Sequence, residues 1–198
     1  MDSSTESART VVYRPARPED GAAIEALDGS FTTDAVYEVT VTDGGFTILP
    51  MPVDPPFRKV FPDDGEDGEE EGDEEGRSGD GDGSLPTRRT VVAVAGDELC
   101  GFVATSFEPW NARLTVRDIE VAPGWRGRGI GRALMGHALD FARECGAGHL
   151  WLEVSNVNAP AVRAYLRMGF AFCGLDTSLY DGTASAGEKA LFMALPVR

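Results

Sequence analysis

A glycine- and arginine-rich stretch between a predicted strand and a predicted helix constrains this chain most. Residues 124–136 read GWRGRGIGRALMG. Backbone N–H groups at a helix N-terminus attract anions, and glycine lets the backbone approach phosphate oxygens closely, so this loop predicts a phosphate site. The spacing excludes a dinucleotide fingerprint, because Arg132 stands where a third glycine must follow Gly127 and Gly129. It also excludes a Walker loop, because Ile130 stands where lysine is required.

The pattern of apolar residues predicts a mixed α/β sheet that is covered by helices. Strands alternate apolar and polar residues, whereas helices repeat apolar residues every three or four positions. A phase slip between Val116 and Ile119 is typical of a β-bulge. The predicted strands are 10–17, a hairpin at 35–49 around Asp43, 89–99, 100–110, 112–123, 149–155, 170–176 and 188–197, and the predicted helices are 18–27, 130–145 and 158–169. Strands followed by a strand-helix-strand-helix-strand run favour a single mixed sheet.

Most of the negative charge lies in one segment. The chain has 198 residues, of which 42% are hydrophobic, and a net charge of −15. Residues 63–82 hold twelve acidic side chains and one basic side chain. Without aliphatic or aromatic residues, this run cannot bury enough apolar surface to offset the entropy of ordering. We therefore expect one domain over 1–198 with a disordered acidic insertion at 63–84. An acidic tether for a cationic partner and adaptation to high salt remain alternatives.

The composition excludes several classes of protein. We expect a cytoplasmic protein without a membrane span, because no apolar run approaches about 20 residues and no signal peptide is recognisable. The acidic balance argues against nucleic-acid binding through a basic face. Cys100, Cys145 and Cys173 lie far apart without metal-ligand spacing, so we expect buried structural thiols, no disulfide and no metal site.

The loop spacing resembles the signature of the GNAT superfamily of N-acetyltransferases. Arg126, Gly129 and Gly131 form R-x-x-G-x-G directly after a strand, and "WLEVSNVNAPAVRAYLRMGF" resembles the second hallmark of that family. The resemblance implies the GNAT fold, with a mostly antiparallel six- to seven-stranded sheet flanked by helices, and acetyl-CoA as cosubstrate. The cofactor-binding residues that it implies are Ile119, Val121, Arg126, Gly127, Arg128, Gly129, Ile130, Gly131, Arg132, Asn158 and Tyr165. The family threads pantetheine between two diverging strands, so the sheet should splay beside Val121.

Within that superfamily the chain is most similar to the streptothricin acetyltransferases, which acetylate an amine of the antibiotic's β-lysine moiety. The similarity includes the loop, the second hallmark and the run "FCGLDTSLYDGT". It implies a small-molecule amine as acceptor and an antibiotic-resistance role. The long acidic insertion departs from that group, which affects the expected substrate more than the fold.

The catalytic candidates under this resemblance are Glu153, Glu120 and Tyr165. Acetyl transfer needs an unprotonated amine and a proton for the leaving thiolate. Glu153, Asn158 and Tyr165 reproduce the spacing of base, asparagine and acid in ribosomal-protein N-terminal acetyltransferases. Glu120, on the strand before the loop, is an equally acceptable base, and the sequence leaves the choice open. Direct transfer in a ternary complex is expected, because no cysteine is placed for an acyl-enzyme.

The acceptor is the least constrained part of the prediction. A cationic amine favours carboxylates and aromatic rings, and the resemblance places five candidates around its entrance, namely Asp34, Tyr37, Glu108, Trp110 and Asp176. A protein N-terminus or lysine is an alternative acceptor. A regulatory module that binds acetyl-CoA without turnover is an alternative function, and a homodimer is left open.

Overall fold

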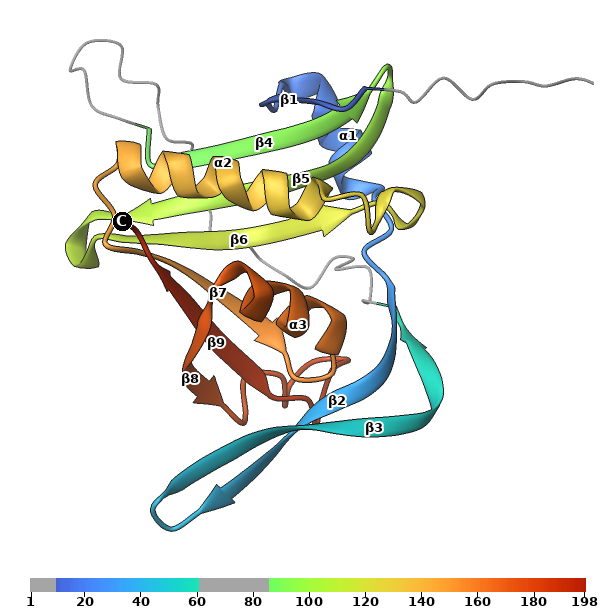
Figure 1. Cartoon of the computed structure of the whole chain (residues 1–198), viewed down its shortest axis with the longest axis vertical. Helices are drawn as coiled ribbons and strands as arrows, with labels where there is room; N and C mark the ends of the chain where they lie inside the picture. Colours follow the sequence, from blue (N-terminus) through green and yellow to red (C-terminus); the bar gives the residue numbers. More distant parts are fainter. Residues whose placement is uncertain (1–9, 61–85) are drawn as a thin grey trace, which may run out of the picture.

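A seven-stranded sheet and an attached two-stranded ribbon form the β-structure of the computed structural model, which describes residues 10–60 and 86–198 (Figure 1). The sheet runs in the order β1-β4-β5-β6-β7-β9-β8. Its strands are β1 Val12–Pro15, β4 Arg88–Ala95, β5 Glu98–Glu108, β6 Arg113–Val121, β7 His149–Ser155, β8 Ala171–Asp176 and β9 Ala190–Pro196. Strands β6 and β7 pair in parallel and the other neighbours pair antiparallel. The predicted mixed, mostly antiparallel sheet is confirmed.

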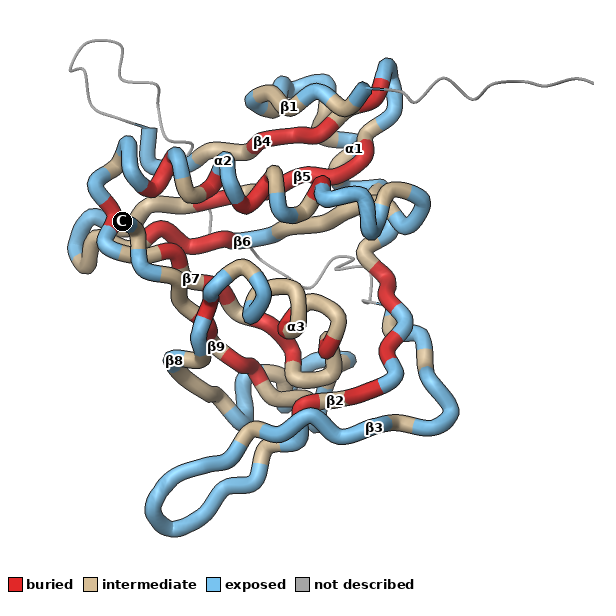
Figure 2. Tube along the Cα trace, in the orientation of Figure 1, coloured by how far each residue is buried: buried red, intermediate tan, exposed pale blue. Residues whose placement is uncertain are grey.

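Two amphipathic helices cover one side of the sheet. Helix α2 (Ile130–Glu144) lies in front of β4–β6 and helix α3 (Ala159–Met168) lies in front of β7 and β9 (Figure 1). Helix α2 buries Leu134, Ala138 and Phe141, which recur at the predicted helical spacing. Figure 2 shows the buried positions of β4, β5, β7 and β9 behind these helices. The core therefore lies between the sheet and its two helices.

The first predicted helix is shorter than expected. Residues 18–27 were expected to form one helix, whereas the structure has a 3-10 turn at Pro18–Asp20 followed by α1 (Gly21–Glu25). Gly21 at the junction lowers helical stability. The Asp20 side chain instead accepts hydrogen bonds from the Arg14 guanidinium at 2.6 and 2.8 Å, and this ion pair fixes the turn against β1.

The predicted hairpin is longer than the sequence pattern indicated. Strands β2 (Phe31–Thr42) and β3 (Gly45–Lys59) pair over nearly their whole length, and β3 includes the proline-rich run 50–56. A two-stranded ribbon leaves an open edge on each strand, where proline removes no necessary ladder bond. Figure 1 shows the turn of this ribbon extending away from the main sheet.

Asn156 attaches the ribbon to the main sheet. Its side-chain amide donates to the Tyr37 carbonyl at 2.9 Å, and its backbone carbonyl accepts from the Tyr37 N–H at 2.8 Å. Its side-chain oxygen also accepts from the Lys189 N–H at 2.7 Å. One side chain thus connects β2 to the end of β7 and to the segment before β9.

The cysteines match the prediction only in part. All three are free thiols, with Cys100 buried, Cys145 half-buried and Cys173 exposed. The expectation of buried thiols is wrong for Cys173, because strand β8 is the outer strand of the sheet.

The described ranges hold neither a cluster of metal ligands nor a membrane-spanning helix. Within residues 10–60 and 86–198 no group of three or more His, Cys, Asp or Glu side chains is arranged to hold a metal ion. None of the helices in these ranges has the length and hydropathy that a membrane span requires. The predicted disordered insertion at 63–84 lies outside the described residues.

Candidate functional site

The site is centred on a gap between the two parallel strands. Strands β6 and β7 pair only from Arg113–His149 to Val116–Leu152. At that point the β5–β6 register shifts between Ala104 and Thr105, so Arg117 is the extra residue of a β-bulge. The predicted bulge and the predicted splay of the sheet are therefore both confirmed. Residues 117–121 and 153–155 diverge and line two adjoining cavities.

The glycine loop has the geometry of an anion site. Gly127 and Gly129 have φ angles of 76° and 84°, in the left-handed region that favours glycine. Gly129 is the N-cap of α2, and no side chain caps that helix end. The first-turn N–H groups therefore have no side-chain cap, as a phosphate site requires.

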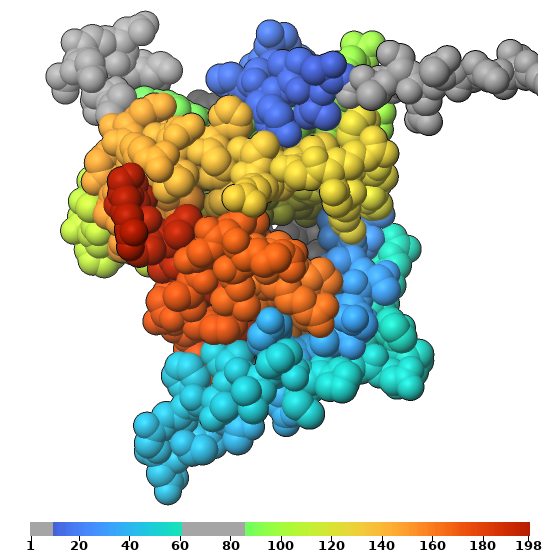
Figure 3. All heavy atoms as spheres, in the orientation of Figure 1, coloured from blue at the N-terminus to red at the C-terminus, as the bar shows by residue number. Residues whose placement is uncertain are grey.

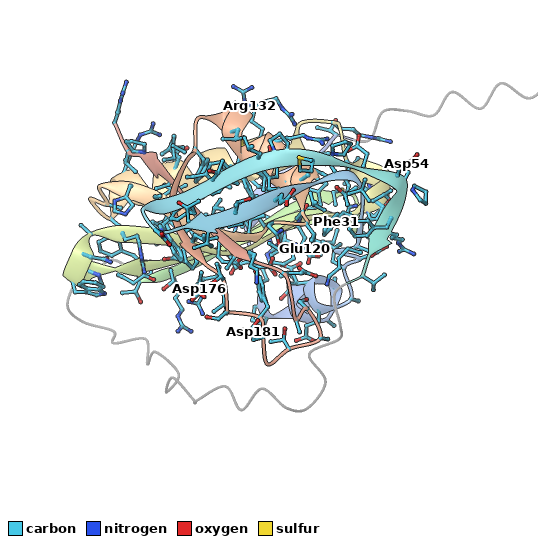
Figure 4. The ribbon with its side chains drawn as sticks, turned by 90° about the horizontal axis from the view of Figure 1, so that it is seen from below. Phe31, Asp54, Glu120, Arg132, Asp176 and Asp181 are labelled. Carbon is cyan, nitrogen blue, oxygen red and sulfur yellow. The ribbon has the colours of Figure 1, made fainter. Side chains whose placement is uncertain are left out.

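The other predicted loop residues take different positions. Ile130 is 2% exposed and its side chain packs in the hydrophobic core. Arg128 stacks over the Trp125 ring at 4.8 Å. Arg132 is exposed and lies at the margin of the molecule in Figure 4, remote from Glu120 near the centre. The backbone of this loop is thus better placed for an anion than the Arg132 side chain.

The donors of Arg126 are directed to backbone carbonyls. Its Nε donates to the Val121 carbonyl at 2.8 Å. Its Nη1 donates to the Ser30 carbonyl at 2.6 Å and its Nη2 to the Asp28 carbonyl at 3.1 Å. Arg126 borders the first cavity, but these bonds connect the end of β6 to the loop that precedes β2.

The first cavity lies beside the glycine loop and has a volume of about 330 Å³. Figure 3 shows a hollow between α2 with its preceding loop, in yellow, and α3, in orange, with β2 in blue beside it. The lining combines the end of β6 with one side of α3, from its N-cap to its last residue, and is mostly apolar. The residues are Gly29, Phe31, Thr32, Ile119, Glu120, Val121, Arg126, Gly131, Asn158, Pro160, Ala161, Ala164, Tyr165 and Met168.

Asn158 is both the N-cap of α3 and a wall of the cavities. Its Oδ1 accepts a hydrogen bond from the Ala161 N–H at 3.2 Å. Its side-chain amide has a donor group in addition, and the residue lines both cavities. Asn158 thus caps the helix, and its cofactor role remains a prediction.

The second cavity is smaller and acidic. It occupies about 220 Å³ in the gap between β6 and β7. Asp118 and Glu120 of β6 and Glu153 of β7 border it, with Tyr165 of α3 and Tyr180 of the loop before β9. Glu120, Asn158 and Tyr165 line both cavities. The three catalytic candidates of the sequence are thus brought together around one gap.

The two glutamates have different surroundings. Burial raises the pKa of Glu120 to about 7, with Asp118 and Asp28 acting in the same direction and Arg126 in the opposite one. Burial also raises the pKa of Glu153, but the Tyr180 hydroxyl donates to its carboxylate and acts against that rise. Glu120 therefore combines a position at the junction of the cavities with a pKa near neutrality.

The tyrosines keep their protons at neutral pH. Burial raises the pKa of Tyr165 above its ordinary value, and the charges of Asp118 and Glu153 act in the same direction. Burial and the hydrogen bond to Glu153 raise the pKa of Tyr180. Both hydroxyls are therefore donors in the physiological range.

None of the five predicted acceptor residues lines the acidic cavity, and their role toward the acceptor remains a prediction. Glu108 accepts from the Thr115 hydroxyl at 2.8 Å, and Trp110 follows it with 83% exposure. They lie beside Arg113, at the opposite end of β6 from Glu120, because the β5–β6 turn is at that end.

The remaining three candidates make structural contacts. Asp34 pairs with Arg163 at 3.0 Å. Tyr37 is 6% exposed and packs in the core, 6.0 Å from Phe172 between ring centroids. Asp176 accepts from the backbone N–H of Ser178 and fixes the turn after β8.

Sequence reasoning missed Gly29 and Tyr180. A Cβ atom at Gly29 would lie 2.2 Å from Glu120 Oε1, so a larger residue there would have to displace that carboxylate. Tyr180 belongs to the run "FCGLDTSLYDGT", which carried the resemblance, but nothing in its local pattern indicates a contact with Glu153. Both residues reach the site only through folding.

Comparisons with known proteins agree with this geometry. Residues 54–170 match the model of the Acetyltransferase (GNAT) family. A streptothricin acetyltransferase from Streptomyces lavendulae is 60% identical over 195 residues, which cover 98% of each chain. The crystal structure of a nourseothricin acetyltransferase superposes with a TM-score of 0.82 at 58% identity, covering 95% of this chain and 99% of that chain.

A more distant structure shares the fold. It is a putative streptothricin acetyltransferase from Bacillus anthracis in complex with acetyl coenzyme A, with a TM-score of 0.73 at 22% identity, covering 96% of this chain and 99% of that chain.

Proposed function

Because the chain belongs to the acetyltransferase (GNAT) family, we propose that it transfers an acetyl group from acetyl-CoA to a primary amine of a streptothricin-class antibiotic. The observation that carries the proposal is the adjacency of the two cavities. One adjoins an uncapped helix N-terminus, and the other is bordered by Asp118, Glu120 and Glu153. Carboxylates in a partly desolvated cavity favour a cationic amine.

The first cavity fits the cosubstrate in shape and chemistry. The glycine loop offers backbone N–H groups to the pyrophosphate. The apolar lining residues, among them Phe31, Ile119 and Met168, suit the pantetheine arm. Asn158 offers a side-chain amide beside that arm. When bound, acetyl-CoA supplies an activated acetyl thioester.

Glu120 is the proposed general base. A primary amine with a pKa of about 10.4 is protonated at neutral pH and must lose a proton before it can attack a carbonyl carbon. A carboxylate whose pKa lies near 7 is ionised in part at neutral pH and accepts that proton directly or through water. Glu120 lines both cavities, which supports a role at the junction of amine and thioester.

Tyr165 is the proposed proton donor. Its hydroxyl is protonated at neutral pH because burial raises its pKa. It lines both cavities, so it can donate toward a leaving sulfur while Glu120 accepts from the amine. Glu153, held by Tyr180, is proposed to bind a second ammonium of the acceptor.

Thiol release from acetyl-CoA tests the proposal. The acceptors are streptothricin, free β-lysine, lysine and peptides with a free N-terminus. Fast release with streptothricin supports it. Release with peptides alone would identify a protein acetyltransferase, and cofactor binding without release would identify a regulatory module; either result contradicts the proposed function.

A further inference from the structure

The loop between α1 and β2 covers the proposed base. Gly29 lies against the Glu120 carboxylate so closely that an added Cβ atom would be 2.2 Å from Oε1 and 2.8 Å from Cδ. Two arginines from distant parts of the chain hold this loop. Residues 28–30 therefore form a fixed turn that holds Gly29 in the wall of both cavities.

The first arginine is the signature arginine of the glycine loop. Three of the five N–H donors of Arg126 bond carbonyls, two of them on Asp28 and Ser30 and the third on Val121, the residue after Glu120. A planar guanidinium can join three acceptors in a fixed geometry, which an ammonium cannot.

The second arginine comes from the ribbon. Arg58 of β3 donates from Nη2 and Nε to the Ser30 hydroxyl at 2.8 and 3.1 Å, and to Asp28 Oδ2 at 3.2 Å. Asp28 Oδ1 accepts from the Ser30 N–H at 2.9 Å and closes the turn around Gly29. The turn is thus held from both sides.

Resting on the function proposed above, we propose that Arg126 is a positioning residue for the base rather than chiefly a ligand of the cofactor phosphates. It fastens residues 28–30 over Glu120, excludes water from one side of the carboxylate and couples the glycine loop to the acceptor cavity. Gly29 is the residue that makes this contact possible, because any side chain would displace the carboxylate.

The charges around Glu120 determine how its pKa responds when Arg126 loses its contacts with residues 28–30. The groups concerned are Asp118 on its own strand, Asp28 and Arg126 on the two connected loops, Tyr165 on α3 and Glu153 on β7. Arg126 lowers the pKa of Glu120 by its charge, whereas residues 28–30, which lie over the carboxylate, raise that pKa by desolvation. A useful variant must therefore keep the positive charge and remove the hydrogen bonds to the three carbonyls.

Arg126→Lys is that variant. Lysine retains the positive charge for a phosphate, but its donors all lie on one nitrogen and cannot reproduce the spacing of Nε, Nη1 and Nη2 toward the three carbonyls. The expected results are a loss of kcat of about tenfold, a shift of the acid limb of kcat/KM toward lower pH by about one unit, and an affinity for CoA within about twofold of wild type. Arg128→Lys is the matched control in the same loop, and its acid limb stays where the wild type has it.

A truncated cosubstrate separates the two roles. S-acetylpantetheine lacks the pyrophosphate, so the ratio of wild-type to Arg126→Lys activity is the same with it as with acetyl-CoA if Arg126 acts through the loop. The proposal would be overturned if the ratio of wild-type to Arg126→Lys activity fell to one with S-acetylpantetheine, while Arg126→Lys bound CoA tenfold more weakly and kept the acid limb of the wild type.

Two measurements guard against misfolding and against failure of the proposed function. NMR titration of Glu120 in the free, ¹³C-glutamate-labelled protein is expected to show a lower carboxyl pKa in Arg126→Lys, whether or not any amine is acetylated. Gly29→Ala is expected to lose kcat while keeping its affinity for CoA. A Glu120 titration that is identical in wild type and Arg126→Lys contradicts the positioning role of Arg126 even if antibiotic acetylation is confirmed.

Discussion

The anion site and the acidic cavity are built in different ways. The anion site beside the first cavity comes from one continuous β6-loop-α2 unit, where backbone N–H groups and positive φ angles provide the geometry. The acidic cavity is bordered by residues from five separate segments, including Gly29, Glu120, Glu153, Tyr165 and Tyr180. The anion half of the site is therefore local in sequence, whereas the acidic half depends on a few groups that folding brings together.

The largest expected effect lies in the acidic half. We expect Glu120→Gln to lower kcat by about 10³-fold, because a positioned base contributes roughly 10²–10⁴-fold. In the wild type kcat/KM should decline as pH falls below about 7, since the raised pKa leaves Glu120 protonated there and unable to accept the amine's proton. Glutamine should abolish that acid limb.

Glu153→Gln provides the matched comparison for Glu120. It should raise KM for the acceptor with a smaller loss of kcat. The reverse pattern, with the acid limb lost in Glu153→Gln, would transfer the role of base to Glu153. Steady-state kinetics from pH 5.5 to 9, a range chosen to bracket the Glu120 pKa of about 7, measures both variants.

Tyr165 belongs to both halves and should have the next largest effect. We expect Tyr165→Phe to lower kcat by about 10²-fold, because the variant keeps the ring that packs near Phe170 but removes the proton donor. The affinity for acetyl-CoA, measured by calorimetry, should change little. Unchanged turnover would remove Tyr165 from the mechanism.

A change in the local half should act on binding rather than on chemistry. Gly129 has a φ of 84°, so Gly129→Val should strain the loop by about 1–3 kcal/mol and raise KM for acetyl-CoA about tenfold. The control is Gly136→Ala in α2, where an added Cβ meets nothing within 4 Å and should stabilise the helix by about 0.5–1 kcal/mol. An unaltered KM in Gly129→Val would show that the loop geometry is dispensable.

The smallest effect is expected at the opposite end of β5. Trp110 is 83% exposed and lies at the end of β5 that is remote from Glu120. Trp110→Ala should therefore leave KM for the acceptor within about twofold and the melting temperature nearly unchanged. A large rise in acceptor KM would mean that the acceptor extends much farther than the two cavities.

Sequence patterns predicted the local elements better than their lengths and neighbours. The bulge beside Arg117, the cap at Asn158 and the glycine loop follow from residue types within a few positions, and all three elements are present. The ribbon β2–β3 was underestimated because prolines argue against a central strand. They are acceptable here because each strand of the ribbon has an open edge.

The sequence by itself determined the phosphate loop and the elements of the mixed sheet, because these depend on periodicity and spacing along short stretches of chain, and the resemblance to the GNAT superfamily supplied the three catalytic candidates. The tertiary structure alone decided which carboxylates share a cavity and that Gly29 lies against one of them. It also gave Arg126 its partners on residues 28–30, nearly one hundred positions away. Burial and the charges of Asp118, Arg126 and Asp28 set the pKa of Glu120, and no local pattern in a sequence records how distant segments combine to produce them.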